Sequence, residues 1–109
     1  MAENKRRHRR VDVNIVVNLY EPDSAEPTAQ GIIKNLSAGG IGVETRGVFK
    51  ENNIIQLNFY LPDGTYLRNV EGRIVWLRQK NGSYNLGVRF LDIGIRNKLR
   101  IWWYVRKRE

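Results

Sequence analysis

The sequence predicts an all-β fold, a six-stranded antiparallel β-barrel followed by a C-terminal α-helix. Six segments are strand-like, and four of them carry apolar residues at every second position; turn-forming residues separate the segments, and the apolar spacing becomes helical after Phe90. In a chain this short, closing six strands into a barrel removes the exposed sheet edges. The 109 residues, 41% of them hydrophobic, are enough for one core. We therefore expect one barrel domain over residues 11–109, preceded by a flexible basic segment over residues 1–10.

Three strand-like segments make up the first half of the expected barrel. Residues 11–19 alternate strictly between apolar and mostly polar side chains, and the loop that follows, residues 21–27, contains two prolines. Residues 28–34 form a short strand that ends at a turn beginning with Asn35, and residues 40–45 form its antiparallel partner.

The second half of the barrel has the clearest turn signals. Residues 55–61 alternate up to Pro62-Asp63-Gly64, where the glycine can take the positive φ that a turn requires. Residues 66–77 are rich in β-forming side chains, and residues 84–90 again alternate strictly. Between them, Asn81-Gly82 is the strongest two-residue hairpin signal in the chain.

The last segment predicts a helix over residues 93–106. Asp92 can cap its N-terminus, and the basic residues 106–108 suit the negative end of the helix dipole. Four apolar side chains have helical spacing and are expected to pack this helix on the barrel: Ile95, Leu99, Trp102 and Trp103. The alternative for the two tryptophans is a partner surface or a platform for base stacking.

The composition argues against catalysis and points to an anionic partner. The chain has no cysteine and a single histidine, His8, which lies inside an arginine run and has no suitable nucleophile or orienting carboxylate nearby. We therefore expect no enzyme activity, no metal and no cofactor. The net charge of +8 attracts anions, although charge alone does not choose between nucleotides, nucleic acid and acidic lipids. Neither a transmembrane helix nor a signal peptide is expected, which predicts a cytoplasmic location.

Two short polar motifs carry the chemistry. The first, Arg6-Arg7-His8-Arg9-Arg10, presents guanidinium groups, which bind phosphate oxygens and the O6/N7 edge of guanine in a bidentate manner. The spacing between Arg6 and Arg10 suits a compact dianion better than a long duplex. Without a second feature, this run is also typical of a nonspecific nucleic-acid arm or a solvated tail.

The second motif is the segment from Asn35 to Gly40. Asn35 offers an amide, Ser37 a hydroxyl, and Gly39-Gly40 an unobstructed backbone, so a planar base can approach closely and form hydrogen bonds along its edge. Asn, Ser and Gly are also the residues of an ordinary structural turn.

The two motifs in this order, ahead of a barrel and a terminal helix, resemble the PilZ domain family. The family signature is Arg-x-x-x-Arg followed by Asp/Asn-x-Ser-x-x-Gly, and the five matching residues here are Arg6, Arg10, Asn35, Ser37 and Gly40. The resemblance covers essentially the whole chain. Each motif is short, and the ordered combination gives the resemblance its specificity.

This resemblance implies a bacterial receptor for the second messenger cyclic di-GMP, with residues 1–10 clamping the ligand. Arg6 and Arg10 would bind phosphate and guanine, while Asn35, Ser37 and Gly40 would lie under a base or phosphate. Additional ligand contacts are expected from Arg7, Arg9 and Gly39, and from Trp76, whose strand position carries a stacking aromatic residue in some members. Trp76 can equally be a half-buried barrel residue.

The chain departs from the usual family pattern at two positions. Arg9 stands where many members carry proline, which leaves the segment more flexible before binding and raises the cost of ordering it. Asn35 replaces the commoner aspartate, and an amide lacks the bidentate, charge-assisted contact that a carboxylate makes to guanine N1 and N2. Both departures predict a modestly lower affinity.

The sequence is also compatible with two other functions. The chief rival is a barrel that binds RNA or single-stranded DNA through the basic segment and aromatic side chains, although nucleic acid is not the expected ligand. The other is a protein-interaction module that has lost ligand binding and uses the terminal helix. For the receptor, we expect a protein partner downstream and a signal in which the ligand orders residues 1–10.

Overall fold

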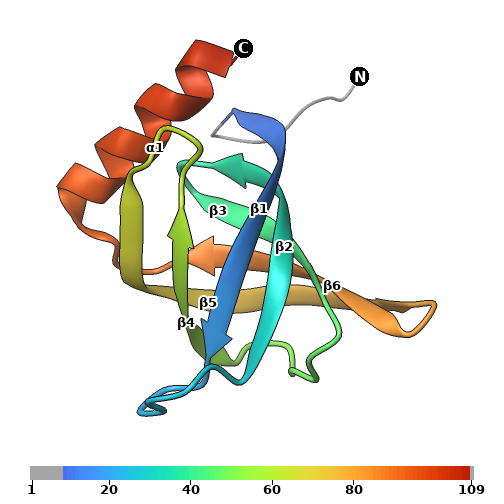
Figure 1. Cartoon of the computed structure of the whole chain (residues 1–109). Coiled ribbons are helices and arrows are strands. Elements are labelled where there is room, and N and C mark those ends of the chain that lie inside the picture. Colours follow the sequence, from blue (N-terminus) through green and yellow to red (C-terminus); the bar gives the residue numbers. More distant parts are fainter. Residues whose placement is uncertain (1–8, 109) are drawn as a thin grey trace.

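The computed structural model describes residues 9–108 and confirms the predicted fold. Six antiparallel strands form a closed barrel in the order β1-β2-β3-β6-β5-β4, and one helix packs against its outside (Figure 1). The elements are β1 (Arg10–Tyr20), β2 (Ala29–Ser37), β3 (Gly40–Thr45), β4 (Ile54–Tyr60), β5 (Tyr66–Lys80), β6 (Ser83–Phe90) and α1 (Gly94–Arg108).

The core fills the inside of the barrel with alternate side chains from every strand. Its largest fully buried members include Phe59, Leu19, Ile33, Leu36, Ile55, Leu57, Leu67, Ile74 and Leu86. Because side chains on a strand point to opposite faces in turn, each inward apolar residue leaves its neighbours on the outer surface. Polar residues of the barrel can therefore meet a ligand on its outer surface.

The turns follow the predicted residues in two places. Asn81 (φ 50°) and Gly82 (φ 83°) connect β5 and β6, and both are left-handed, as the preferred two-residue hairpin turn requires. Gly64 (φ 95°) completes the turn between β4 and β5. These positions combine backbone freedom with a short loop, which sets the register of each hairpin.

One prediction about the second motif was wrong. The strand expected over 28–34 continues to Ser37, so Asn35 lies inside β2 and not in a turn. Asn35 faces Asp12 of β1 on one side and Gly42 of β3 on the other. A bulge next to Asn35 shifts the register of β2 against both neighbours, and the turn itself is reduced to Ala38-Gly39.

The face of α1 that packs on the barrel was also predicted wrongly. The buried side chains of α1 are Ile101, Tyr104 and Val105, whereas the four expected to be buried, Ile95, Leu99, Trp102 and Trp103, are exposed. The helix carries apolar residues on two faces, and the spacing alone does not decide which face meets the barrel. The cap was predicted correctly, because the Gly94 amide donates to Asp92 Oδ1 at 3.3 Å.

Within residues 9–108, none of the helices has the length and apolar character needed to cross a bilayer.

Candidate functional site

The turn between β2 and β3 is closed by Ser37. Its Oγ accepts hydrogen bonds from the amides of Gly39 and Gly40 and donates to the Gly40 carbonyl oxygen, each at 3.2 Å. These three contacts use the hydroxyl inside the turn. Ser37 therefore shapes the surface beside β1 and holds the Gly39 and Gly40 backbone in place.

Gly40 allows two strands to approach closely. A Cβ at this position would overlap the carbonyl oxygen of Val88 and lie 3.2 Å from Cα of Arg89. Because these obstacles are backbone atoms of the neighbouring strand, no side-chain rotation can make room. The motif glycine is thus required by the packing of β3 against β6, whatever else it contacts.

A line of outer-face residues, which we call the arginine row, crosses the barrel at the level of this turn. Arg10, the first residue of β1, pairs with Ser37, and beyond the turn Gly40 pairs with Arg89, which in turn pairs with Arg73. Arg10 and Arg89 are exposed, while the Arg73 guanidinium donates to the Asn52 carbonyl oxygen at 3.1 Å. The row brings three cations from different strands to one edge of the surface.

A second line, which we call the glycine row, lies two residues further along β1, β2, β3 and β6, and three residues further along β5, where a bulge adds one residue. It consists of Asp12, Asn35, Gly42, Gly87 and Trp76, each paired in register with the next. Two residues of extended strand span about 7 Å, so the two rows are neighbours on one face.

The glycines make this row flat. A Cβ at Gly42 would lie 2.6 Å from Nδ2 of Asn35, and one at Gly87 would overlap the Trp76 indole. The Asn35 amide therefore packs over Gly42, and the Trp76 ring packs over Gly87 from the opposite side. Trp76 keeps 42% of its surface exposed, and the Arg78 guanidinium lies 5.6 Å from the centre of its ring. The arrangement offers an aromatic face and an amide side by side.

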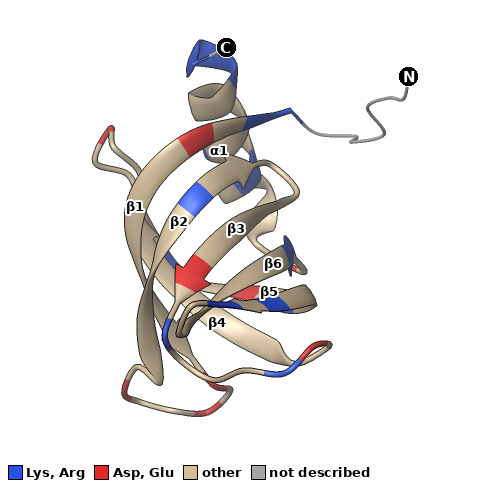
Figure 2. Cartoon of the chain, turned by 90° about the vertical axis from the view of Figure 1, so that its right-hand side faces the viewer, with Lys and Arg blue, Asp and Glu red and all other residues tan. Residues whose placement is uncertain are grey.

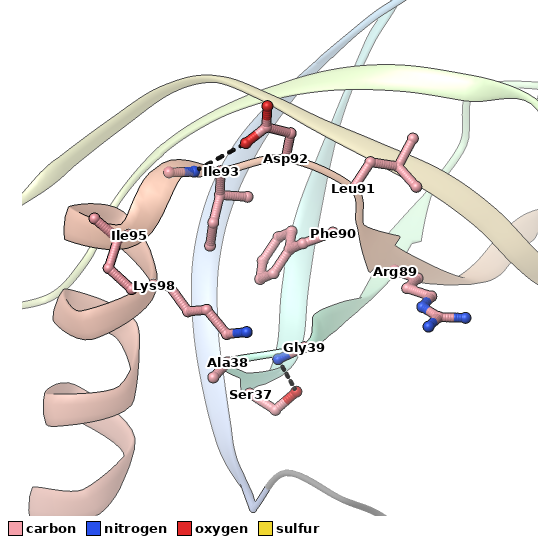
Figure 3. Close-up of a pocket in the computed structure, with 11 residues that line it drawn as sticks. Ser37, Ala38, Gly39, Arg89, Phe90, Leu91, Asp92, Ile93, Ile95 and Lys98 are labelled. Atoms are coloured by element: carbon pink, nitrogen blue, oxygen red, sulfur yellow. Dashed lines mark hydrogen bonds between the residues drawn. The ribbon is translucent and has the colours of Figure 1, made fainter.

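A cavity of about 630 Å³ opens where the motif turn meets the start of α1 (Figure 3). Ser37, Ala38 and Gly39 form one wall, and residues 89–95 with Lys98 form the other. Figure 3 shows Lys98 extending from α1 toward Ala38, while Arg89 points away from the helix. The Phe90 amide donates to the Gly39 carbonyl oxygen at 2.9 Å, so the turn is tied to the connection that leads into α1.

The structure brings most of the described site residues together. Arg10, Asn35, Ser37, Gly39, Gly40 and Trp76 lie in the two rows or in the turn that joins them. Arg9 is exposed immediately before β1, and Arg6 and Arg7 lie outside the described residues. Within residues 9–108, no group of His, Cys, Asp and Glu side chains is arranged to hold a metal ion.

Sequence reasoning missed five residues of this surface: Asp12, Gly42, Arg73, Gly87 and Arg89. The alternation of inward and outward residues along the predicted strands could have identified them, because each occupies an outward position. Strand order was the missing information, since β6 pairs with β3 across a long stretch of sequence.

The fold and this surface define a small six-stranded β-barrel with clustered arginines on one outer face. A sequence model of the PilZ domain family matches residues 4–107. The chain belongs to the PilZ domain family.

Solved structures share this fold at low sequence identity. The inhibitor of motility MotI/DgrA of Bacillus subtilis superposes with a TM-score of 0.82 at 17% identity, covering 97% of this chain and 52% of that one. YcgR of Escherichia coli, solved in complex with c-di-GMP, gives 0.78 at 14% identity, covering 94% and 45%. The chain thus spans about half the length of both proteins. No curated protein matches the chain in sequence.

Separate PilZ domains are matched over nearly their whole length. The PilZ domain of Escherichia coli YcgR with c-di-GMP gives a TM-score of 0.75 at 14% identity, covering 96% of this chain and 94% of that one. The PilZ domain of CeSA from a cellulose-synthesizing bacterium gives 0.63 at 20% identity, covering 91% and 96%.

Proposed function

We propose that this chain is a receptor domain for cyclic di-GMP and binds it on the outer barrel face formed by the arginine row and the glycine row. The observation that carries the proposal is the juxtaposition of Arg10 with a flat surface made by Asn35, two glycines and Trp76. Family membership and the c-di-GMP complexes of YcgR support it. The domain catalyses no reaction in this proposal.

The chemistry of each side chain suits one part of the ligand. The Arg10 guanidinium binds phosphate or the O6/N7 edge of guanine, together with Arg6, and Arg7 and Arg9 add positive charge. A guanine stacks on the exposed Trp76 face, and the Asn35 amide oxygen accepts from its N–H groups. Asp12, paired with Asn35, supplies the carboxylate that most members carry at position 35.

The signal in this proposal is the ordering, by the ligand, of the basic segment before Arg10. Arg10 itself is part of β1. Bound phosphates neutralise the arginines, and the segment closes over the barrel surface, which changes the surface offered to a downstream protein partner in the bacterial cytoplasm. Trypsin cleaves after arginine, so saturating cyclic di-GMP should slow cleavage between Arg6 and Arg10 severalfold. If saturating ligand leaves the cleavage rate unchanged, the ligand does not order this segment. The proposal that the domain binds cyclic di-GMP would be unaffected.

Trp76 gives a direct optical test of the ligand site. Replacing Trp76 with alanine should weaken cyclic di-GMP binding about tenfold, because base stacking on an aromatic side chain contributes about 1–3 kcal/mol. Trp76→Phe should bind within a few-fold of the wild type but lose the ligand-induced change in tryptophan fluorescence. Calorimetry and fluorescence titration measure the two effects separately.

The matched control is Trp103, an exposed tryptophan on α1. Trp103→Phe should keep both the affinity and the fluorescence change. A fluorescence change that survives in Trp76→Phe and disappears in Trp103→Phe would place the ligand on the helix instead. Binding that grows with polynucleotide length and falls steeply with salt would favour the nucleic-acid alternative.

A further inference from the structure

The outer face of α1 carries a stripe of large apolar side chains. Ile95 is 70% exposed, Leu99 52%, Trp102 44% and Trp103 57%. At about 3.6 residues per turn these four lie on one side of the helix, opposite the side that buries Ile101, Tyr104 and Val105. We call them the outer stripe.

Positive charge borders the outer stripe on both sides. The helix contains six basic residues and no acidic one: Arg96, Lys98, Arg100, Arg106, Lys107 and Arg108. The helical period places Lys98 along one border, Arg96, Arg100 and Lys107 along the other, and Arg106 in line with the stripe at its C-terminal end. The blue segments of α1 in Figure 2 show this basic character, which continues to the C-terminal end.

Two cations lie against the tryptophans of the stripe. The Arg106 guanidinium is 5.2 Å from the centre of the Trp102 ring, and the Lys107 ammonium is 5.9 Å from that of Trp103. The two rings meet edge to face at 5.6 Å. A partner for this surface must present anions immediately next to an apolar layer.

The aromatic surface continues beyond the helix. Tyr60 and Tyr66, at the base of the turn between β4 and β5, stack at 4.4 Å and are 60% and 42% exposed. This turn passes beside α1 in Figure 1, and hydrogen bonds from Thr65, with a smaller contribution from the positive charge of Lys107, lower the pKa of its Asp63. The C-terminal half of α1 therefore has further amphipathic rings near it.

We propose that α1 binds the surface of an anionic lipid bilayer, lying parallel to it with the outer stripe at the level of the headgroups. A bilayer surface places anionic phosphates directly above acyl chains, which matches an apolar stripe with basic borders. Tryptophan is enriched at this boundary because its ring is apolar and its N–H is polar. The proposal concerns peripheral binding and is independent of the cyclic di-GMP site.

The charge pattern disfavours the other occupants of such a face. A second copy of the chain would bring two basic helices together, and like charges in one interface oppose association. Nucleic acid would require cations along the whole centre of the contact, where the structure has Ile95 and Leu99 and a cation, Arg106, at the C-terminal end beside Trp102. An acidic groove on another protein would also match the basic borders of the stripe. Vesicle binding distinguishes lipid from such a protein.

Co-sedimentation of the full chain with lipid vesicles tests the proposal. The protein should bind vesicles that contain phosphatidylglycerol and should not bind vesicles of phosphatidylcholine alone. Its tryptophan emission should shift to shorter wavelength on binding, and the shift should persist in Trp76→Phe. Leu99→Gln combined with Trp103→Gln should reduce the vesicle affinity about tenfold or more.

The control separates the outer stripe from general surface hydrophobicity. Val48→Gln changes another apolar side chain, 72% exposed and outside α1, and should leave vesicle binding unchanged. Thermal unfolding of both variants should match the wild type, since all three side chains are exposed. Equal binding to both vesicle types, unchanged binding of the Leu99/Trp103 variant, or self-association that buries the stripe would each overturn the proposal.

Discussion

Replacing Arg10 with alanine is expected to weaken cyclic di-GMP binding at least tenfold. Arg10 is the first residue of β1 and pairs with Ser37, which places it at the junction of the strand and the arginine segment. A bidentate guanidinium contact to a guanine edge contributes about 1–3 kcal/mol, so its loss corresponds to about tenfold or more in affinity. Calorimetric titration of the wild type and the variant measures the difference.

Arg46 provides the matched control for Arg10. It is an exposed arginine just past the far end of β3, six positions beyond Gly40. Arg46→Ala removes the same charge from the same barrel, and it should leave the affinity within about twofold because only screened, long-range attraction is lost. Equal weakening by both substitutions would mean that net charge, and not a defined site, determines binding.

Gly40 and Gly42 should respond differently to the same substitution. Gly40→Ala places a Cβ against the backbone of Val88 and Arg89 and should lower the free energy of unfolding by about 1–3 kcal/mol. The three atoms nearest to the Cβ of Gly42→Ala all belong to the Asn35 side chain, so the effect on the free energy of unfolding should stay below about 1 kcal/mol. Urea unfolding of the two variants measures both values.

Gly42→Ala should weaken cyclic di-GMP binding although it changes the free energy of unfolding little. Displacing the Asn35 amide in Gly42→Ala removes one hydrogen bond to guanine, about fivefold in affinity, from a protein of nearly normal stability. If Gly42→Ala binds cyclic di-GMP as tightly as the wild type, the Asn35 amide is not part of the site.

The sequence predicted the barrel well because the determinants of its strands are local. Alternation of apolar residues defines an inward face, and Asn81-Gly82 and Gly64 provide left-handed turn positions, so each hairpin can be recognised without knowing the rest of the fold. The strand boundary at Asn35 escaped prediction because a bulge lets the strand continue through residues typical of turns.

The buried face of the helix and the composition of the glycine row could not be predicted from sequence patterns. Apolar residues occupy both faces of α1, and the choice between Ile101 and Trp103 as the buried position depends on the shape of the barrel surface. Gly87 and Trp76 become neighbours of Asn35 only through the pairing of β3 with β6 and of β6 with β5. Long-range strand pairing of this kind is invisible in a single sequence.

The two motifs of the sequence acquire different tasks in the structure. Ser37 and Gly40 build the turn and the close contact of β3 with β6, whereas Arg10 and Asn35 present functional groups to the outer surface. Part of the family signature thus builds the surface on which the other part displays its side chains.

The most direct test of the site is an NMR titration of ¹⁵N-labelled protein with cyclic di-GMP, observed at the glycine amides. The proposed site predicts saturable shifts at Gly39, Gly40, Gly42 and Gly87, and little change at Gly64 and Gly82 in the turns after β4 and β5. No shift at high micromolar ligand, or shifts confined to glycines outside the motif turn and the glycine row, would contradict the proposed function.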